Sequence, residues 1–306
     1  MPEVSIIIPV YNREQLLKEA VYSVFGQTFK DYEIIIVNDG STDNSLFEAE
    51  QLCKEPNAEG RCRVINIEHC GFPGAVRNRG VESSSGEFIA FLDSDDLWLP
   101  SKIEQQLEYM KTSKALISHT REIWQRGDRI ISQKKQRHER AGDIFKDALG
   151  KCIIGPSTVM IDREFYIKTG GFHEKIEIAE DYEYWLRITA SNRIGYLDIP
   201  LTTKRAGGWP QLSEKYGKIE WFRLNALSAL LGVELPMMTV APLYMGNYKW
   251  PGFDDQHFSL AMDELLFKCN VWADGCRKRG KNYEADEFSG IISSIQGDNY
   301  NETGAT

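Results

Sequence analysis

The chain has 306 residues, with 36 Lys and Arg against 45 Asp and Glu, a net charge of −9 and a hydrophobic content of 42%. This apolar content is enough to form a buried core, which excludes a disordered or collagen-like chain. The acidic balance argues against a protein whose main partner is the phosphate backbone of nucleic acid. If the ligand is anionic, its charge has to be offset by Arg, Lys or a bound metal ion.

No apolar run approaches the roughly 18 residues that a membrane-spanning helix needs, and the N-terminus lacks the basic and apolar regions of a signal peptide. We therefore expect a protein without a transmembrane segment that resides in the cytoplasm. Its six cysteines form no Cys-x-x-Cys pair and no regular spacing, so neither a zinc site nor a disulfide framework is indicated. The sequence predicts six reduced thiols.

The first hundred residues repeat a short apolar run, a polar turn and a segment with helical periodicity. The apolar runs, rich in β-branched residues, are 5–10, 33–37, 64–67 and 88–92. Strands that are apolar on both faces are typical of a parallel sheet covered by helices on both sides. Asn12 is placed to cap the first helix, and Pro100 opens a later one. The pattern predicts an α/β fold built from βαβ units.

Beyond residue 112 the pattern is weaker. Strand-like runs are 115–117, 130–131 and 158–161, and helical periodicity covers 181–191, a segment from 219 onward and about 258–278. Pro and Gly interrupt the pattern over 236–251, and the tail from residue 297 is expected to be frayed. The basic stretch 133–140 is either a solvated loop or a contact for a phosphate-bearing acceptor.

Polar turns follow the four predicted strands at their carboxyl ends, the edge at which open α/β sheets bind ligands. We expect a ligand site where these turns converge. No Gly-x-Gly-x-x-Gly follows the first strand and no Gly-Lys-Ser/Thr motif occurs. The sequence therefore argues against a dinucleotide-binding site and against a P-loop. The turns are Tyr11-Asn12, Asn38-Asp39-Gly40, His69-Cys70-Gly71 and Asp93-Ser94-Asp95-Asp96.

The acidic turn 93–96 presents several carboxylate oxygens together, the ligands that Mg²⁺ and Mn²⁺ prefer. The alternative is an acidic turn that only caps the helix after Pro100. Residues 41–43 have the residue types that cap a following helix. Helix capping does not account for the carboxylate of Asp39, which stands before them at the tip of the second strand. Tyr11, at the first tip, either stacks on a planar base or covers the core.

Six motifs occur in a fixed order along the chain. They are Pro9-Val10-Tyr11-Asn12, Asp39-Gly40-Ser41-Thr42-Asp43, Ala75-Val76-Arg77-Asn78, Leu92-Asp93-Ser94-Asp95-Asp96, Gly170-Gly171-Phe172 and Glu180-Asp181. Together they resemble a family 2 glycosyltransferase of the GT-A fold, and the resemblance covers about residues 3 to 205. It implies a mostly parallel open sheet flanked by helices, to which the helical pattern after residue 232 adds a C-terminal helical appendage.

The resemblance implies a set of nucleotide-binding residues. Tyr11 matches the residue that stacks on the base, Asp39 matches the one that hydrogen-bonds to the edge of the base, and Arg77 matches a basic residue near the nucleotide. Pro9 and Ser94 belong to the same matched motifs and complete the set. The implied donor is a nucleotide sugar, with UDP as the expected nucleotide.

The resemblance also implies a metal site and a catalytic base. Asp93 and Asp95 match an Asp-x-Asp motif, with Asp95 as the direct ligand of a Mn²⁺ or Mg²⁺ that bridges the diphosphate. Asp181 matches the base of inverting members, although on the residues alone it is equally an N-cap. Lys204 and Arg205 are candidates for assisting the leaving diphosphate, on a looser match.

The chain is accordingly divided into 1–97, which binds the nucleotide sugar, 98–231, which binds the acceptor and supplies the base, and 232–306, a helical extension. The expected acceptor is a saccharide, a lipid-linked sugar or a protein, and nucleic acid is not expected. For the extension, acceptor docking, self-association into a homo-oligomer and peripheral membrane contact stay open.

The sequence disfavours two other function classes. A sugar nucleotidyltransferase shares an α/β nucleotide fold, but it would need a Gly-rich N-terminal loop with a following basic residue, which Pro9-Val10-Tyr11-Asn12 does not provide. A non-catalytic sugar-nucleotide binding module would be marked by loss of Asp95 or Asp181, and both residues are present.

Overall fold

The computed structural model describes residues 1–58, 60–133, 138, 140–207, 219–233, 235 and 252–302, with the backbone alone for 294 and 296–302. The strands are β1 (Val4–Val10), β2 (Tyr32–Asp39), β3 (Cys62–Ile67), β4 (Phe88–Phe91), β5 (Leu97–Trp98), β6 (Ile117–Arg126), β7 (Arg129–Ile131), β8 (Met160–Asp162) and β9 (Gly195–Ala206). The helices are α1 (Glu14–Phe25), α2 (Ser45–Leu52), α3 (Pro73–Glu82), α4 (Lys102–Ser113), α5 (Phe145–Gly150), α6 (Arg163–Lys168), α7 (Glu180–Ser191), α9 (Ile219–Leu231), α10 (Asp255–Lys278) and α11 (Asn282–Glu302), with 3₁₀ turns η1 (Pro56–Ala58) and η2 (Pro156–Thr158).

The strands form one sheet in the order β3-β2-β1-β4-β8-β6-β9-β5, with β7 paired to β6. The first four strands are parallel, and Ile7 at the centre of β1 lies opposite Ile35 of β2 and Phe91 of β4. β8 is antiparallel to both β4 and β6, and β9 runs parallel to β6. Strand order reverses beside β1, which is the place where open α/β sheets hold their ligands.

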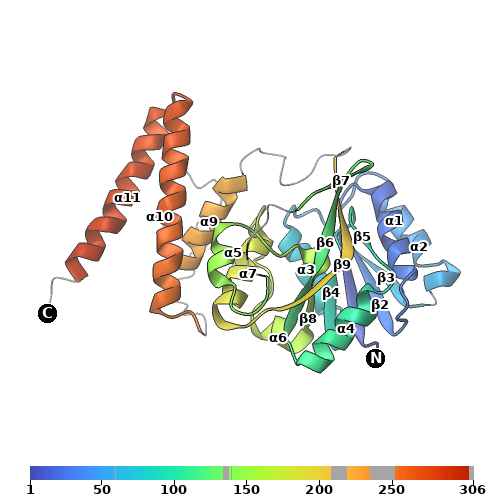
Figure 1. The fold of residues 1–306 in the computed structure, drawn as a ribbon. Coiled ribbons are helices and arrows are strands. Elements are labelled where there is room, and N and C mark those ends of the chain that lie inside the picture. The colour runs from blue at the N-terminus through green and yellow to red at the C-terminus, as the bar shows by residue number, and fades with distance from the viewer. Residues whose placement is uncertain are drawn as a thin grey trace.

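Alternate residues of the central strands pack on opposite faces of the sheet. Ile6 and Ile8 belong to an apolar cluster with α1, α2 and α4, whereas Ile7 belongs to a second cluster with α3, α6 and α7. The two layers of helices are visible on either side of the sheet in Figure 1. Gly80 allows α3 to approach closely, because a Cβ there would lie 2.3 Å from Cγ2 of Ile7. The predicted α/β class is therefore confirmed.

Some local predictions were wrong. Asn12 does not cap α1, since Arg13 holds the N-cap position and Asn12 has a left-handed backbone with φ of 50°. The Asn12 side-chain oxygen instead accepts the Thr42 amide at 2.8 Å and ties the first polar turn to the second. The backbone of α11 is helical to Glu302, so the helix extends into the tail for which fraying from residue 297 was expected. The segment 236–251 lies outside the described residues, as does most of the basic stretch 133–140.

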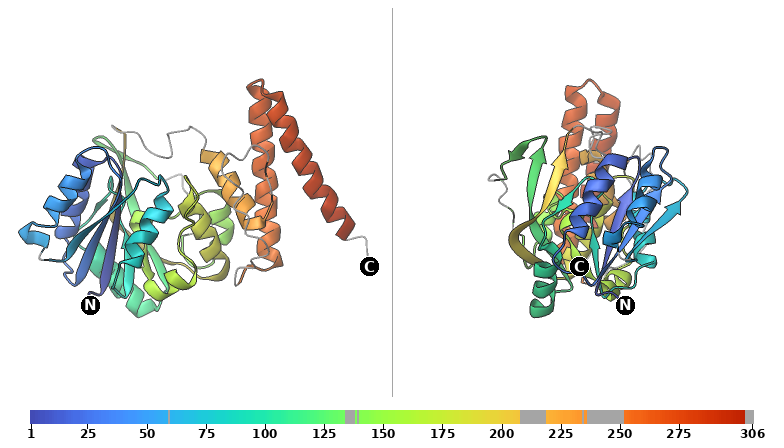
Figure 2. Two further views of the ribbon diagram at one scale, coloured as in Figure 1. Left: turned by 180° about the vertical axis from the view of Figure 1, so that it is seen from behind. Right: turned by 90° about the vertical axis from the view of Figure 1, so that its right-hand side faces the viewer.

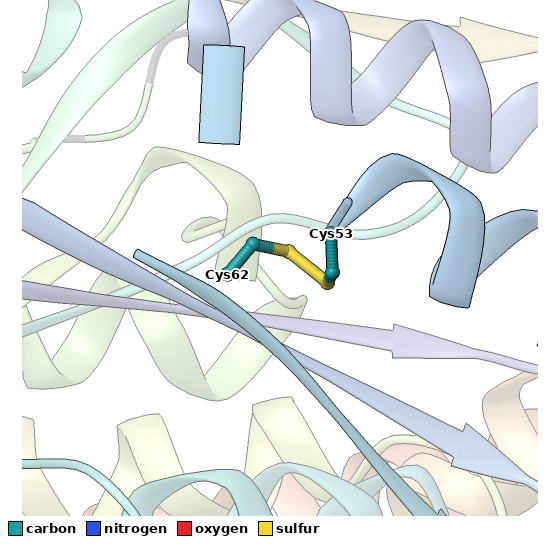
Figure 3. The surroundings of a disulfide bond; sticks show 2 residues. All are labelled: Cys53 and Cys62. Carbon is teal, nitrogen blue, oxygen red and sulfur yellow. A yellow bond between two sulfur atoms is a disulfide. The ribbon is translucent and has the colours of Figure 1, made fainter. Parts of the chain in front are cut away.

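The expectation of six reduced thiols was wrong as well, because Cys53 and Cys62 form a disulfide (Figure 3). Cys53 follows the end of α2 and Cys62 begins β3, and their Cα atoms lie 4.8 Å apart, within the range that a disulfide spans. The pair is brought together by the packing of α2 on β3 rather than by any spacing visible in the sequence. The bond lies at the amino end of β3, at the edge of the sheet opposite the predicted ligand site.

The C-terminal helices lie on the far side of α7 from the sheet. Buried residues of α9, α10 and α11 share one apolar cluster with α5 and α7, and α10 and α11 form a hairpin that projects from the body (Figures 1 and 2). None of the described helices has the length and hydropathy needed to cross a bilayer. The segments 1–97 and 98–231 contribute strands to the same sheet, so the proposed division of the chain stays a prediction about roles.

Candidate active site

A cavity of about 1040 Å³ opens at the carboxyl ends of β1, β2 and β4. All four polar turns contribute to its wall, and so do the carboxyl ends of β6 and β9, which run in the same direction. The residues that the sequence predicted for the site all line it. These are Pro9, Tyr11, Asp39, Arg77, Asp93, Ser94, Asp95 and Asp181.

Asp39 is almost fully buried and holds the loop after β3 in place. Its Oδ1 accepts the amide of Cys70 at 2.8 Å, and its Oδ2 accepts the amide of Gly71 at 3.1 Å. The Nδ1 of His69 lies 2.9 Å from both Oδ2 and the main-chain oxygen of Asp39, so this nitrogen carries the hydrogen. A carboxylate offers about four acceptor positions, which leaves room for one further donor.

His69 also stacks on Tyr11, with ring centroids 4.1 Å apart and an angle of 15° between the planes. One face of the Tyr11 ring is therefore covered, and only the other face is open to a planar ligand group. Sequence reasoning placed the turn containing His69 at the ligand edge but gave the residue no role. The available signal was its position directly after a strand tip.

The acidic turn after β4 is fixed from inside the protein. The amide of Asp93 donates to Oγ of Ser157 at 3.0 Å, and the same Oγ donates to Asp96 at 2.7 Å. Burial, together with the charge of Asp95, raises the pKa of Asp96 to about 8. All three carboxylates of this turn line the cavity, with Asp96 buried and Asp93 and Asp95 half-buried.

Two cavity carboxylates are consistent with a phosphate-bridged cation. No group of three or more His, Cys, Asp or Glu that could hold a metal is found in the described part of the chain. Mg²⁺ and similar hard cations usually bind through one or two carboxylates and complete their shell with water and substrate phosphates. The donor set of Asp93 and Asp95 fits that mode and does not fit an all-protein cage.

Arg77 joins the acidic turn to the start of α7. Its Nη2 donates to Asp93 Oδ1 at 2.6 Å, and its Nη1 donates to Glu180 Oε1 at 2.5 Å. Burial alone would lower the pKa of this guanidinium. The charges of Asp93 and Glu180 outweigh that effect and raise the pKa above its usual value, so Arg77 stays charged. Burial raises the pKa of Glu180 to about 7, against the opposing charge of Arg77. Arg77 is thus an internal ion-pair partner as well as a cavity residue.

Asn78, the next residue of α3, fixes the Gly170-Gly171-Phe172 turn. Its side-chain nitrogen donates to the carbonyl of Phe172 at 2.8 Å, and its oxygen accepts the amide of Phe172 at 3.2 Å. Gly171 has a φ of 62°, and a Cβ there would lie 2.9 Å from the Asn78 side-chain oxygen. The adjacent residues Arg77 and Asn78 of α3 thereby contact three other sequence motifs: the acidic turn 93–96, the turn 170–172 and the start of α7 at Glu180.

Asp181 lies in the first turn of α7. Ala179, with a left-handed backbone, holds the N-cap position, so the N-cap alternative for Asp181 is not what the structure contains. Oδ1 of Asp181 accepts a hydrogen bond from the amide of Tyr182 at 2.7 Å, and Oδ2 of Asp181 lies 3.3 Å from Sγ of Cys152. The cysteine was not among the predicted site residues, and no sequence motif marks it.

The two basic residues at the end of β9 differ in their environment. Arg205 donates from Nε to the carbonyl of Asp95 at 2.6 Å and pairs with Glu19, so it supports the acidic turn. Lys204 is an exposed residue with no hydrogen bond or ion pair to any other described residue. Desolvation of its ammonium in the cavity opposes the charge, but the carboxylates around it, Glu122 foremost, raise its pKa.

The backbone has the GT-A fold. It matches Staphylococcus aureus TarS residues 1–349, solved in complex with UDP-GlcNAc, with a TM-score of 0.63 and 17% identity over 97% of this chain and 92% of that one. This likeness confirms the predicted fold.

Residues 5–170 match the family model described as Glycosyl transferase family 2, and the chain belongs to this family. An "uncharacterized glycosyltransferase" of Rickettsia felis is 38% identical over 208 residues, which are 67% of this chain and 33% of the relative. The chain spans about a third of the length of the first curated relatives it matches. The Escherichia coli protein WfgD, named as a UDP-Glc:α-D-GlcNAc-diphosphoundecaprenol β-1,3-glucosyltransferase, is 30% identical over 64% of this chain and 73% of its own.

Proposed function

We propose that the chain is an inverting glycosyltransferase that moves a sugar from a UDP-sugar to an acceptor hydroxyl. The observation that supports this most directly is the common cavity lined by the base-binding candidates Tyr11 and Asp39, the acidic pair Asp93 and Asp95, and Asp181. UDP is favoured because the E. coli relative is named for UDP-glucose and TarS was solved with UDP-GlcNAc.

The nucleotide base would stack on the free face of Tyr11, since His69 covers the other. Asp39 keeps acceptor capacity beyond its bonds to the 69–71 loop and would accept a hydrogen bond from the edge of the base. The loop amides fix the direction of this carboxylate before the nucleotide arrives. The site is therefore preorganised at its nucleotide end.

The diphosphate would lie beside the acidic turn. A Mn²⁺ or Mg²⁺ bound by Asp93 and Asp95 would neutralise the charge that develops on the leaving diphosphate. Lys204 would add an ammonium on the cavity wall near the same turn, where the surrounding carboxylates stabilise its charge. Arg205 keeps the main chain of Asp95 in place through its bond to the carbonyl.

Asp181 would accept the proton of the acceptor hydroxyl as its oxygen attacks the anomeric carbon on the face opposite the diphosphate. The bond from carbon to the acceptor oxygen forms while the bond to the diphosphate oxygen breaks, and the proton ends on the Asp181 carboxylate. A single displacement inverts the anomeric configuration.

The test compares Asp181→Asn and Asp95→Asn in an assay of UDP release from UDP-glucose and UDP-GlcNAc with Mn²⁺. Asp181→Asn should keep UDP and Mn²⁺ affinity and lose about 10²–10⁴-fold in turnover, because asparagine cannot take the proton. Asp95→Asn should lose the strengthening of UDP binding by Mn²⁺. Asp198→Asn, at an exposed carboxylate paired with Arg121 on the surface, is the matched control and should behave as wild type.

Undiminished turnover by folded Asp181→Asn would show that the base lies elsewhere, and a product with retained configuration would reject the single displacement. Formation of UTP that depends on pyrophosphate would identify a nucleotidyltransferase instead. Saturable binding of every donor in the panel without turnover would identify a binding module.

A further inference from the structure

The thiol of Cys152 stands directly against the carboxylate that the proposed function makes the base. Its Sγ lies 3.3 Å from Oδ2 of Asp181 and 3.3 Å from the carbonyl oxygen of Ile154. Burial, and then the negative charge of Asp181, raise the pKa of Cys152 well above its usual value, so the sulfur keeps its proton. A thiol can donate only one hydrogen, and the charged carboxylate is the stronger of the two acceptors.

The loop that carries Cys152 is fixed at both ends. The carbonyl of Gly150 accepts a hydrogen bond from Nζ of Lys268 on α10 at 3.0 Å. The carbonyl of Gly155 accepts the amide of Thr158 at 2.9 Å and its hydroxyl at 2.7 Å. Cys152 is therefore presented to Asp181 by a segment with little freedom to move.

The second oxygen of the same carboxylate is also held. Oδ1 of Asp181 accepts the amide of Tyr182 at 2.7 Å, and the Tyr182 hydroxyl donates to the carbonyl of Leu149, at the end of the helix before Cys152. The main chain of α7 thus restrains one oxygen and the thiol restrains the other. Rotation of the carboxylate would break one of these bonds.

We propose that Cys152 is a positioning residue, whose thiol donates to Oδ2 of Asp181 and holds the carboxylate in the orientation that receives the acceptor proton. This inference rests on the proposed role of Asp181. It assigns Cys152 no contact with the donor or acceptor. Its effect should therefore fall on the chemical step and leave nucleotide binding unchanged.

The experiment compares Cys152→Val, which keeps an apolar side chain and removes the donor, with Cys152→Ser, which keeps a donor. The assay is UDP release from UDP-glucose and UDP-GlcNAc with Mn²⁺, together with calorimetric UDP affinity and the melting temperature. Cys152→Val should lower kcat by about tenfold, the factor expected for the loss of one hydrogen bond, with donor KM and UDP affinity unchanged. Cys152→Ser should restore most of the rate.

The same substitutions in the Asp181→Asn background separate positioning from packing. If the thiol acts through the carboxylate, Cys152→Val should have no further effect on the rate there. Wild-type kcat in Cys152→Val, an equal loss in both backgrounds, or failure of Cys152→Ser to recover the rate would overturn the proposal. If valine does not fold at this position, Cys152→Ala provides the same comparison. Full turnover of Asp181→Asn by itself would instead reject the proposed function.

Discussion

Arg77 and Glu180 form a buried ion pair across the cavity wall, with side chains only 6% and 7% exposed. The two residues are 103 positions apart, and the second amino group of Arg77 pairs with Asp93. One guanidinium therefore connects the acidic turn to the residue next to Asp181. A change at Arg77 should reach both ends of the site.

Arg77→Gln should destabilise the protein by about 3–5 kcal/mol, because it leaves two carboxylates without their buried counter-charge. Urea unfolding measures this loss. Adding Glu180→Gln removes one of the two uncompensated carboxylates and should restore part of the stability. Arg79→Gln on the same helix is the matched control, since its ion pair with Glu82 is exposed and screened by solvent, so its loss should hardly change stability. Equal losses for Arg77→Gln and Arg79→Gln would contradict this account.

Asp39→Ala should weaken UDP binding by about 1.5–3 kcal/mol, the range for a hydrogen bond to a charged group. The variant also loses the anchor of the 69–71 loop, so a second variant is needed to separate the two effects. His69→Phe keeps a ring against Tyr11 and leaves the carboxylate in place, and it should lose much less affinity. Calorimetry with UDP measures both. If His69→Phe loses as much affinity as Asp39→Ala, the loop and not the carboxylate reads the base.

Lys102→Met should stabilise the protein by about 1–3 kcal/mol, because the Lys102 amine is fully buried against Trp98 with one long hydrogen bond, at 3.4 Å, to Val159. Burial lowers the pKa of Lys102 well below its usual value. Between that lowered pKa and the unfolded value of about 10.4, the unfolded chain binds more protons, so wild-type stability rises with pH. The gain from methionine should thus be larger at pH 7 than at pH 9.5. A gain independent of pH would show that the amine is not desolvated.

Replacing both Cys53 and Cys62 by alanine should lower the free energy of unfolding by about 2.5 kcal/mol, the loop-closure contribution expected for a separation of 9 residues. UDP affinity should not change, because the bond lies at the edge of the sheet opposite the cavity. Thiol titration of the unfolded, unreduced protein should detect Cys70, Cys152, Cys269 and Cys276, and reduction should add the remaining two. Six reactive thiols before reduction would contradict the disulfide.

The sequence predicted β1 to β4 to within about two residues because each is a short run of β-branched residues apolar on both faces. β9 was not predicted, since Pro200 interrupts its pattern and the sheet accommodates it through register shifts opposite Thr120 and Arg121. The contacts of Cys152 and His69 depend on loops that meet only after folding. Local patterns indicated where the site lies, but they could not indicate which side chains hold its carboxylates in place.

The cavity also receives the amino ends of α1, α3 and α7, at Arg13, Pro73 and Glu180. Each helix start carries a partial positive charge of about half an elementary charge from its aligned peptide dipoles. The main chain thus creates an attractive electrostatic potential for a diphosphate inside an acidic protein, and this potential does not titrate. Substitution of one basic side chain should therefore reduce donor affinity without abolishing it, because no side-chain change removes the field of the backbone.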